Sequence, residues 1–544
     1  MMKKIIGLII CVVVFSSCAR IVTPTGGEKD YTPPKVKRSF PKNNSTNFNG
    51  KEIRIDFDEY ITLENVSQKL IVSPPLKNKP TITSKLKSLY IKDLDSLQEN
   101  TTYIFDFGDA VRDFNEGNPI SHFVFAFSTG TDIDTMTYYG RLLNSYTLKA
   151  EKVKYVALYS SSDKEIQTTT LPTYITRCDS VGRFRFYNIK QGEYSVLAYD
   201  DNNNSLTYDL ATEGVGFSQS SITAKKENDT IFKGDTLYFS EAKDTVLKLN
   251  EAKFVADREV SIDLSMPVTD SFQIEFINPI LQEDEYIINK IQTDTSATIN
   301  IYLLTEQNVD TLEFYVKEIN NFKEKQKIVF QRKKSKKETK KKFSFVLEGT
   351  KLPYYDTLSL NVPFPLKKDF VLQATIVKDS DSVAINFVQD AKNAKRMVCD
   401  FVLQENTKYL LKIDSSLVVN NKGETNDSLS VVFSTDQKDD YSVFIIALVD
   451  TLNSKKQVIL NLFDDRNNKV GKDIICKANE NKIVFEHLKE GNYKLRAITD
   501  ENNNNKWDNN DFILHKQAEK VQYFPQTINI RKGWEREEEW QISL

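Results

Sequence analysis

Short runs in which apolar and polar residues alternate, many of them rich in aromatic residues, recur along most of this chain of 544 residues. Four of the clearest are Glu52–Phe57, Thr102–Phe107, His122–Phe127 and Tyr194–Tyr199. A period of two residues places one face of a β-strand against a core and the other in solvent. Asn, Asp, Ser and Gly separate the runs, as expected of turns. We therefore predict an all-β chain of β-sandwiches in series.

Helical periodicity is scarce. Only the stretches 66–70 and 391–396 have a spacing that would allow a turn or two of helix. At about 100–200 residues per domain, the length favours three to five modules.

Composition excludes several classes of protein. The chain is 40% hydrophobic and carries a net charge of −3, which is unlike a disordered or collagen-like chain. A mean hydropathy of −0.44 excludes a polytopic membrane protein. Because positive and negative charges nearly cancel, no global field attracts nucleic acid, and we expect no nucleic-acid partner.

The N-terminus has the pattern of a secretory signal. Lys3 and Lys4 precede an apolar run from Ile5 to Phe15, and small residues precede Cys18. The apolar run is too short to cross a bilayer as a helix, so we predict that residues 1–17 are removed and the rest is exported.

The sequence Phe-Ser-Ser-Cys at residues 15–18 resembles a bacterial lipobox. The resemblance implies that Cys18 becomes the first residue of the mature protein and carries covalent lipid, with residues 18–33 as a tether. Several acyl chains hold a soluble protein on a membrane stably, whereas one chain does not. The alternative is a secreted protein that is cleaved elsewhere.

Three cysteines remain in the mature chain beyond Cys18. Cys178, Cys399 and Cys476 are far apart in the sequence and form no Cys-x-x-Cys pair. This spacing indicates neither a disulfide framework nor a thiolate metal site, and we expect three buried small apolar residues.

Two module types occur twice, in the same order. Phe127-Ser-Thr and Phe433-Ser-Thr end one type at an interval of 306 residues, and the turns that begin at Asp200 and Asp500 mark the other at an interval of 300. A further β segment lies between the copies. The predicted modules are 34–131, 137–224, 225–335, 343–437 and 438–544.

The first module resembles the SbsA-type bacterial Ig-like domain that commonly opens envelope lipoproteins of Bacteroidetes. The residues that carry the resemblance lie in 49–60, 72–75, 99–103, 115–119 and 127–130. The second module type, with Gly-x-Tyr at residues 192–194 and 491–493, resembles transthyretin-like or carboxypeptidase-regulatory-like sandwiches. Together the resemblances imply tandem Ig-like and transthyretin-like β-sandwiches with an adhesive or spacer role and no established chemistry.

A basic run lies between the third and fourth predicted modules, at residues 332–342. A solvated linker accounts for it, and the alternative is a patch that binds anionic lipid headgroups or another polyanion.

The strongest candidate for chemistry is a pair of Asn/Asp-rich loops. In the second loop, side chains or carbonyls fall at positions 1, 3, 5, 7, 9 and 12 of a calcium loop: Asp500, Asn502, Asn504, Lys506, Asp508 and Asp511. Position 6 is Asn505 where Gly is usual, and position 12 is Asp where Glu is usual. In the first loop Asp200, Asn202 and Asn204 match, with Asp209 or Glu213 as a substitute for the missing later ligands. Each loop is interpreted either as a calcium (Ca²⁺) site or as a turn whose Asn and Asp side chains cap their own backbone.

Catalytic patterns are absent from the sequence. The three histidines, His122, His487 and His515, have no second histidine at metal-ligand spacing, and no phosphate-binding glycine loop or nucleophile motif appears. The acidic residues Asp56, Asp58 and Glu59 favour a polar strand face over a glycosidase carboxylate pair.

These patterns predict a lipid-anchored, non-enzymatic envelope protein that presents loops or sheet edges to an envelope protein or a glycan. Residues 19–23 have no acidic cluster of the kind that resembles a surface-export signal, which favours the periplasmic face of the outer membrane. Two alternatives stay open: an accessory subunit of an outer-membrane assembly or translocation complex, and a carbohydrate-active hydrolase. The hydrolase is disfavoured because the only three tryptophans, which could form sugar platforms, are all near the C-terminus.

Overall fold

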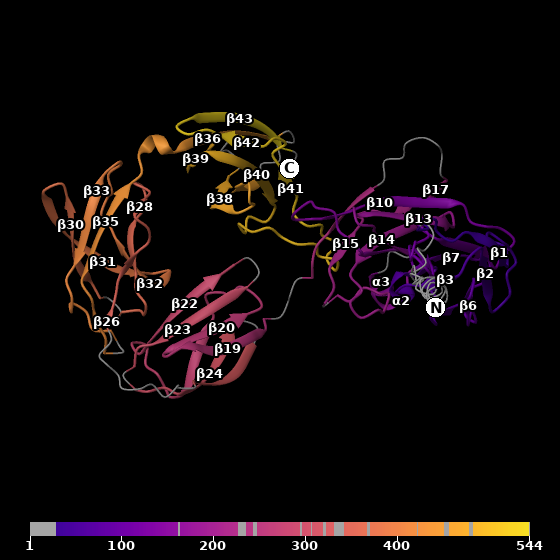
Figure 1. The fold of residues 1–544 in the computed structure, drawn as a ribbon, viewed down its shortest axis with the longest axis horizontal. Coiled ribbons are helices and arrows are strands. Elements are labelled where there is room, and N and C mark those ends of the chain that lie inside the picture. The colour runs from indigo at the N-terminus through magenta and orange to yellow at the C-terminus, as the bar shows by residue number, and fades with distance from the viewer. Residues whose placement is uncertain are drawn as a thin grey trace, which may run out of the picture. The chain divides into compact units, whose positions relative to one another are not determined.

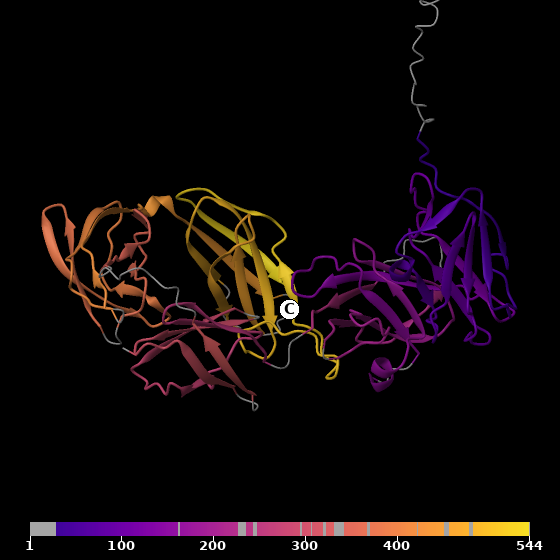
Figure 2. The ribbon, with the colours of Figure 1, turned by 60° about the horizontal axis from the view of Figure 1, so that its bottom comes forward.

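A computed structural model shows a chain whose regular secondary structure is almost entirely β-strand (Figures 1 and 2). The described residues are 29–160, 164–210, 212–226, 235–242, 247–293, 296–305, 307–318, 322–330, 342–366, 370–420, 423–450, 456–477 and 482–542. Within them the helical elements are short: α2 (Val66–Lys69), α3 (Lys164–Thr169) and the 3₁₀ turn η1 (Lys438–Asp440). None of these helices could cross a membrane. The predicted all-β class of tandem sandwiches is confirmed.

The chain divides into two compact units, which we describe separately. The first consists of residues 1–144, 149–209 and 215–239, and the second of residues 145–148, 210–214 and 240–544.

The first sandwich of the first unit is built from a four-stranded sheet, a three-stranded sheet and a strand pair. The four-stranded sheet has the order β1 (Val36–Phe40), β2 (Ile53–Phe57), β6 (Ser88–Lys92), β5 (Thr81–Lys85). The three-stranded sheet has the order β4 (Ile71–Ser73), β7 (Thr102–Asp106), β9 (Val124–Ser128), and β3 (Ile61–Leu63) pairs with β8 (Val111–Asp113). Alternation in β2 places Ile53 and Ile55 in the core with Phe105 and Phe127.

The second sandwich of the first unit contains two further sheets. One holds β10 (Met136–Asn144), β13 (Arg183–Ile189), β17 (Lys225–Lys226) and β18 (Asp235–Phe239). The other holds β11 (Tyr155–Tyr159), β12 (Tyr174–Arg177), β14 (Glu193–Tyr199), β15 (Val215–Phe217) and β16 (Ile222–Thr223). Because β17 and β18 both pair with β10, the predicted module end at residue 224 falls before two strands of this sheet.

The second unit begins with two sheets around one apolar core. The first sheet has the order β19 (Leu249–Ala256), β20 (Glu259–Leu264), β23 (Ala297–Leu303), β22 (Tyr286–Gln292). The second has the order β21 (Gln273–Asn278), β24 (Thr311–Glu318), β25 (Phe322–Val329). Ile262, Ile299 and Phe314 are among the buried residues of this core.

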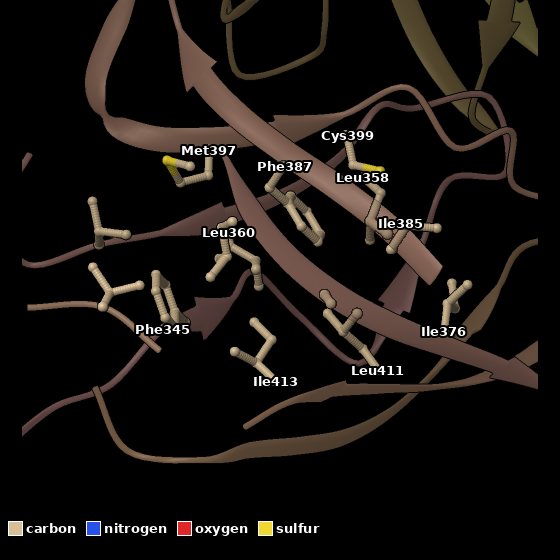
Figure 3. Close-up of a cluster of buried hydrophobic side chains, with 14 of the residues drawn as sticks. Phe345, Leu358, Leu360, Ile376, Ile385, Phe387, Met397, Cys399, Leu411 and Ile413 are labelled. Atoms are coloured by element: carbon tan, nitrogen blue, oxygen red, sulfur yellow. The ribbon is translucent and has the colours of Figure 1, made fainter. Parts of the chain in front are cut away.

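An eight-stranded sheet follows. Its order is β27 (Val346–Leu347), β29 (Leu358–Asn361), β32 (Asn393–Cys399), β31 (Asp381–Asp390), β30 (Leu372–Lys378), β33 (Lys408–Ile413), β35 (Leu429–Thr435), β28 (Lys351–Leu352). β26 (Lys342–Phe343) pairs with β34 (Thr425–Asn426). Figure 3 shows side chains of the core of the eight-stranded sheet, among them Leu358, Phe387 and Leu411.

The helical turn that we expected at 391–396 is wrong. Residues 393–399 form β32, which pairs with β29 and β31, and Asp390 is opposite Asn393 across the turn. Pairing on both sides outweighs the local spacing here. The expected turn at 66–70 corresponds to α2.

The last two sheets of the second unit repeat the topology of β10–β18. One has the order β39 (Lys482–Leu488), β36 (Ser442–Asp450), β43 (Glu535–Ile542). The other holds β38 (Lys469–Cys476), β37 (Gln457–Phe463), β40 (Gly491–Asp500), β41 (Val521–Tyr523) and β42 (Ile528–Ile530). In both copies the first strand pairs in parallel with the last, β10 with β18 and β36 with β43.

The three cysteines of the described residues are buried free thiols. Burial raises the pKa of Cys178 to about 11, so this thiol is protonated and unreactive at neutral pH.

Asp56 ties three strands of the first sandwich together. Its carboxylate accepts hydrogen bonds from Arg38 Nε at 2.8 Å, Arg54 Nε at 2.7 Å and Ser88 Oγ at 2.6 Å. Burial raises the pKa of Asp56, but the hydrogen bonds from Ser88, Arg38 and Arg54 outweigh it and lower the pKa to about 2. A carboxyl group with this pKa is a poor general acid at neutral pH, which argues against a glycosidase pair.

We predict that Asp56→Ala lowers the free energy of unfolding of the first sandwich by about 2 kcal/mol, because three donors lose their acceptor. The stabilisation by Asp56 is fully present above its unfolded pKa of about 3.9 and is lost as the pH falls through about 2. Urea unfolding at pH 7 and pH 2.5 measures both effects. An unchanged urea midpoint at pH 7 would contradict this role for Asp56.

Candidate cation-binding loops

The loop that follows β40 is organised by Asp500, which is 1% exposed. Its carboxylate accepts the backbone N–H of Asn504 at 3.1 Å and of Asn505 at 2.8 Å. It also accepts a hydrogen bond of 2.7 Å from the amide of Gln457, the residue opposite it on β37. Asp500 thus fixes the start of the loop from both sides.

The next predicted ligands lie close together. Asn502 and Asn504 both donate from their side-chain amides to Oδ2 of Asp508. Asn504 Oδ1 accepts the backbone N–H of Lys506 at 2.7 Å. The residues predicted for positions 1, 3, 5 and 9 therefore lie in one loop. Asn and Asp side chains also cap the backbone of this loop, as the Asx-turn interpretation expects.

Asp511 is engaged in a different turn. It pairs through its backbone with Lys516, and its Oδ1 accepts the N–H of Leu514 at 2.8 Å. Both of these contacts of Asp511 stay within residues 511–516.

Glu519 is a further residue of this loop, and the spacing of the predicted ligands does not indicate it. It is 2% exposed, and its two carboxylate oxygens accept the N–H of Glu501 at 2.7 Å and of Asp508 at 3.0 Å. Burial raises the pKa of Glu519, and the negative charges of Asp508 and Asp500 raise it further, while the two backbone donors lower it. Three carboxylates thus share one partly desolvated loop.

A comparison of the two copies of this module shows how Glu519 could be recognised as part of the loop. Glu213 and Glu519 each precede the next strand, β15 or β41, by two residues, and Glu213 is 1% exposed. A buried glutamate at the same place in both repeats is visible once the strand starts are known.

The first loop differs at one decisive position. Asp200 forms an ion pair of 2.6 Å with Lys154, the residue just before β11, whereas the corresponding partner of Asp500 is the neutral Gln457. Asp201 caps the backbone of this loop, because its Oδ1 accepts the N–H of Ser205 at 2.8 Å. Asn202 and Asn204 are exposed, and Asp209 is partly buried. In the first copy, the ammonium of Lys154 therefore already neutralises the carboxylate that begins the loop.

Among the described residues, no group of three or more His, Cys, Asp or Glu side chains is placed to hold a metal ion. A calcium ion in the second loop would need amide and backbone oxygens as well as carboxylates. Cys18 and most of the basic run lie outside the described residues.

Comparison with known proteins identifies the first module. Residues 30–129 match the model of the bacterial Ig-like domain. The predicted resemblance of the first module to a bacterial Ig-like domain is thereby supported, and strands β1–β9 lie within the matched residues. No curated protein matches the chain.

Two of the solved structures that the chain matches are those of a surface layer protein and a pilin subunit. Domains 1–6 of the surface layer protein SbsC are 10% identical, with 92% of this chain and 67% of that chain covered and a TM-score of 0.14. The major pilin subunit BcpA of Bacillus cereus is 9% identical, with 75% of this chain and 99% of that chain covered and a TM-score of 0.15.

Proposed function

We propose that this protein is a lipid-anchored, non-enzymatic component of the bacterial cell envelope, attached through Cys18, whose β-sandwiches present binding surfaces to an envelope partner. The observation that carries the proposal is a lipobox-like segment placed directly before a bacterial Ig-like domain. We favour the periplasmic face of the outer membrane as its location, because no acidic cluster follows Cys18.

The arrangement of charged groups supports a binding role without catalysis. In the Ig-like domain, the carboxylates of Asp56 and Glu64 each contact arginine or lysine side chains at 2.7–2.8 Å. Groups held in this way stabilise a surface and are poorly suited to proton transfer.

Replacing Cys18 tests the anchor. We expect the wild-type protein in the membrane fraction, released by detergent, and Cys18→Ala in the soluble fraction, because acyl chains supply the membrane affinity. Ser17→Ala is the matched control, since it keeps a small residue before the cysteine. Equal membrane retention of Cys18→Ala and wild type would refute the anchor.

We also propose that Ca²⁺ stiffens the loop 500–519 and that Glu519 contributes in the place predicted for Asp511. The supporting observation is that buried Glu519 accepts the backbone N–H groups of Glu501 and Asp508 in the loop that Asp500 begins. Burial raises the pKa of Glu519, and the charges of Asp508 and Asp500 raise it further; a divalent cation would relieve this repulsion. In the first loop Lys154 already neutralises Asp200, so we assign no calcium there.

A further inference from the structure

A polar cavity of about 370 Å³ opens beside the end of β33 and β35. Its lining includes Lys351, Asn406, Lys408, Ser434, Gln437 and Asp440, and two threonines complete it. None of the lining residues is aliphatic or aromatic, and most of the lining surface is polar, which favours a polar ligand. Its volume lies in the range of small-molecule sites and suits one or two sugar rings.

Strand register places three of these side chains in one row. Lys408 on β33 is opposite Ser434 on β35, and Ser434 is opposite Lys351 on β28. Directly paired residues project from the same face of a sheet, so two ammonium groups flank one hydroxyl.

One of the two ammonium groups is already neutralised. Lys351 Nζ lies 2.9 Å from Asp436 and 3.7 Å from Asp440. Asp440 in turn lies 2.7 Å from Lys532, and this hydrogen bond lowers the pKa of Asp440 to about 2. Both carboxylates are therefore ionised and paired at neutral pH.

The remaining groups have no partner among the residues that the structure describes. The ammonium of Lys408, the hydroxyl of Ser434 and the side-chain amide of Asn406 form no hydrogen bond or ion pair there. The acidic residue nearest to Lys408 in the sequence is Glu405. Glu405 does not line the cavity, and its carboxylate accepts the backbone N–H of Lys438 at 2.7 Å. The cavity thus presents one unpaired positive charge beside a hydroxyl and an amide.

We propose that this cavity binds a sugar acid, a saccharide unit that carries one carboxylate. Lys408 would pair with the carboxylate, and Ser434 and Asn406 would exchange hydrogen bonds with ring hydroxyls. A neutral sugar leaves the ammonium unpaired, and a simple carboxylate leaves the hydroxyl and amide unused. The site extends the proposed binding role by naming a glycan class, and it is independent of the lipid anchor.

The test is calorimetric titration of the purified full chain with galacturonate, galactose and acetate. We expect galacturonate to bind at least about tenfold more tightly than galactose or acetate, because only galacturonate satisfies all three groups. Lys408→Ala should weaken galacturonate binding by the same factor and leave galactose unchanged. Galacturonate binding should also be lost below about pH 3, where its carboxyl group is protonated.

Lys412→Ala is the matched control, because Lys412 lies on the same strand, is also exposed and does not line the cavity. It should bind galacturonate as tightly as the wild type. Equal affinity for galacturonate and galactose, equal affinity for galacturonate and acetate, or an equal loss in both lysine variants would overturn the proposal. A failure of the Cys18 anchor would leave all of these results unchanged, so the two proposals fail separately.

Discussion

Phe387→Ala should lower the free energy of unfolding of the eight-stranded sheet by about 4 kcal/mol, through lost burial and an unfilled cavity. Phe387 is fully buried in the core that includes Leu358, Leu360 and Leu411 (Figure 3). Hydrogen exchange of peptides from β30 to β33 under increasing urea measures the loss of protection.

Val383→Ala is the control for this substitution. Val383 lies on β31 with Phe387 but is 49% exposed, so its truncation should cost less than about 1 kcal/mol. Equal effects of the two substitutions would mean that this core is not packed as described.

Asp500→Ala should cost the C-terminal sandwich about 3 kcal/mol in the absence of calcium, because the N–H groups of Asn504 and Asn505 and the amide of Gln457 lose their acceptor. In the wild type, 1 mM calcium should add about 2.7 kcal/mol if the site binds with a dissociation constant of about 10 µM. Asp500→Ala should abolish this gain. All three tryptophans lie at or beyond residue 507, so their fluorescence reports unfolding of this region.

Asp511→Ala and Gln457→Lys separate the alternatives for this loop. Asp511→Ala should keep the calcium response, because Asp511 caps only Leu514. Gln457→Lys should remove the calcium response by supplying an ammonium, as Lys154 does in the first loop. A wild-type protein whose melting temperature is unaffected by calcium would leave only the Asx-turn interpretation.

Much of the fold follows from local pattern. The alternation in β2 correctly predicts that Ile53 and Ile55 face the core, and the aromatic runs correspond to β7, β9 and β14. The pattern of β2 is predictable because a strand with one buried face alternates. By contrast, β7, β9 and β14 are buried at most positions, and their aromatic and β-branched residues identify them as strands.

The pairing of strands that are far apart in the sequence could not be predicted from local pattern. The parallel pairing of β10 with β18 joins residues 140 and 235, and no local signal specifies such a partner. For the same reason, local spacing wrongly predicts a helical turn at 391–396, since the pairing of β32 with β29 and β31 decides the conformation there.

The candidate loop likewise combines contacts that local spacing predicts with contacts that it does not predict. Asp500, Asn502, Asn504 and Asp508 are close in sequence, so their spacing predicted a shared loop. Glu519 reaches that loop only because the chain returns to start β41, and Lys154 reaches Asp200 only across paired strands. The spacing of residues within one segment predicts neither of these two contacts.

Intact mass spectrometry of the protein extracted from membranes tests the central claim most directly. We predict a mature chain that begins at Cys18 and whose mass exceeds that of the polypeptide by covalently bound acyl chains. A mature chain of unmodified polypeptide mass, or one that begins at another residue, would contradict the lipid anchor on which the proposed envelope role depends.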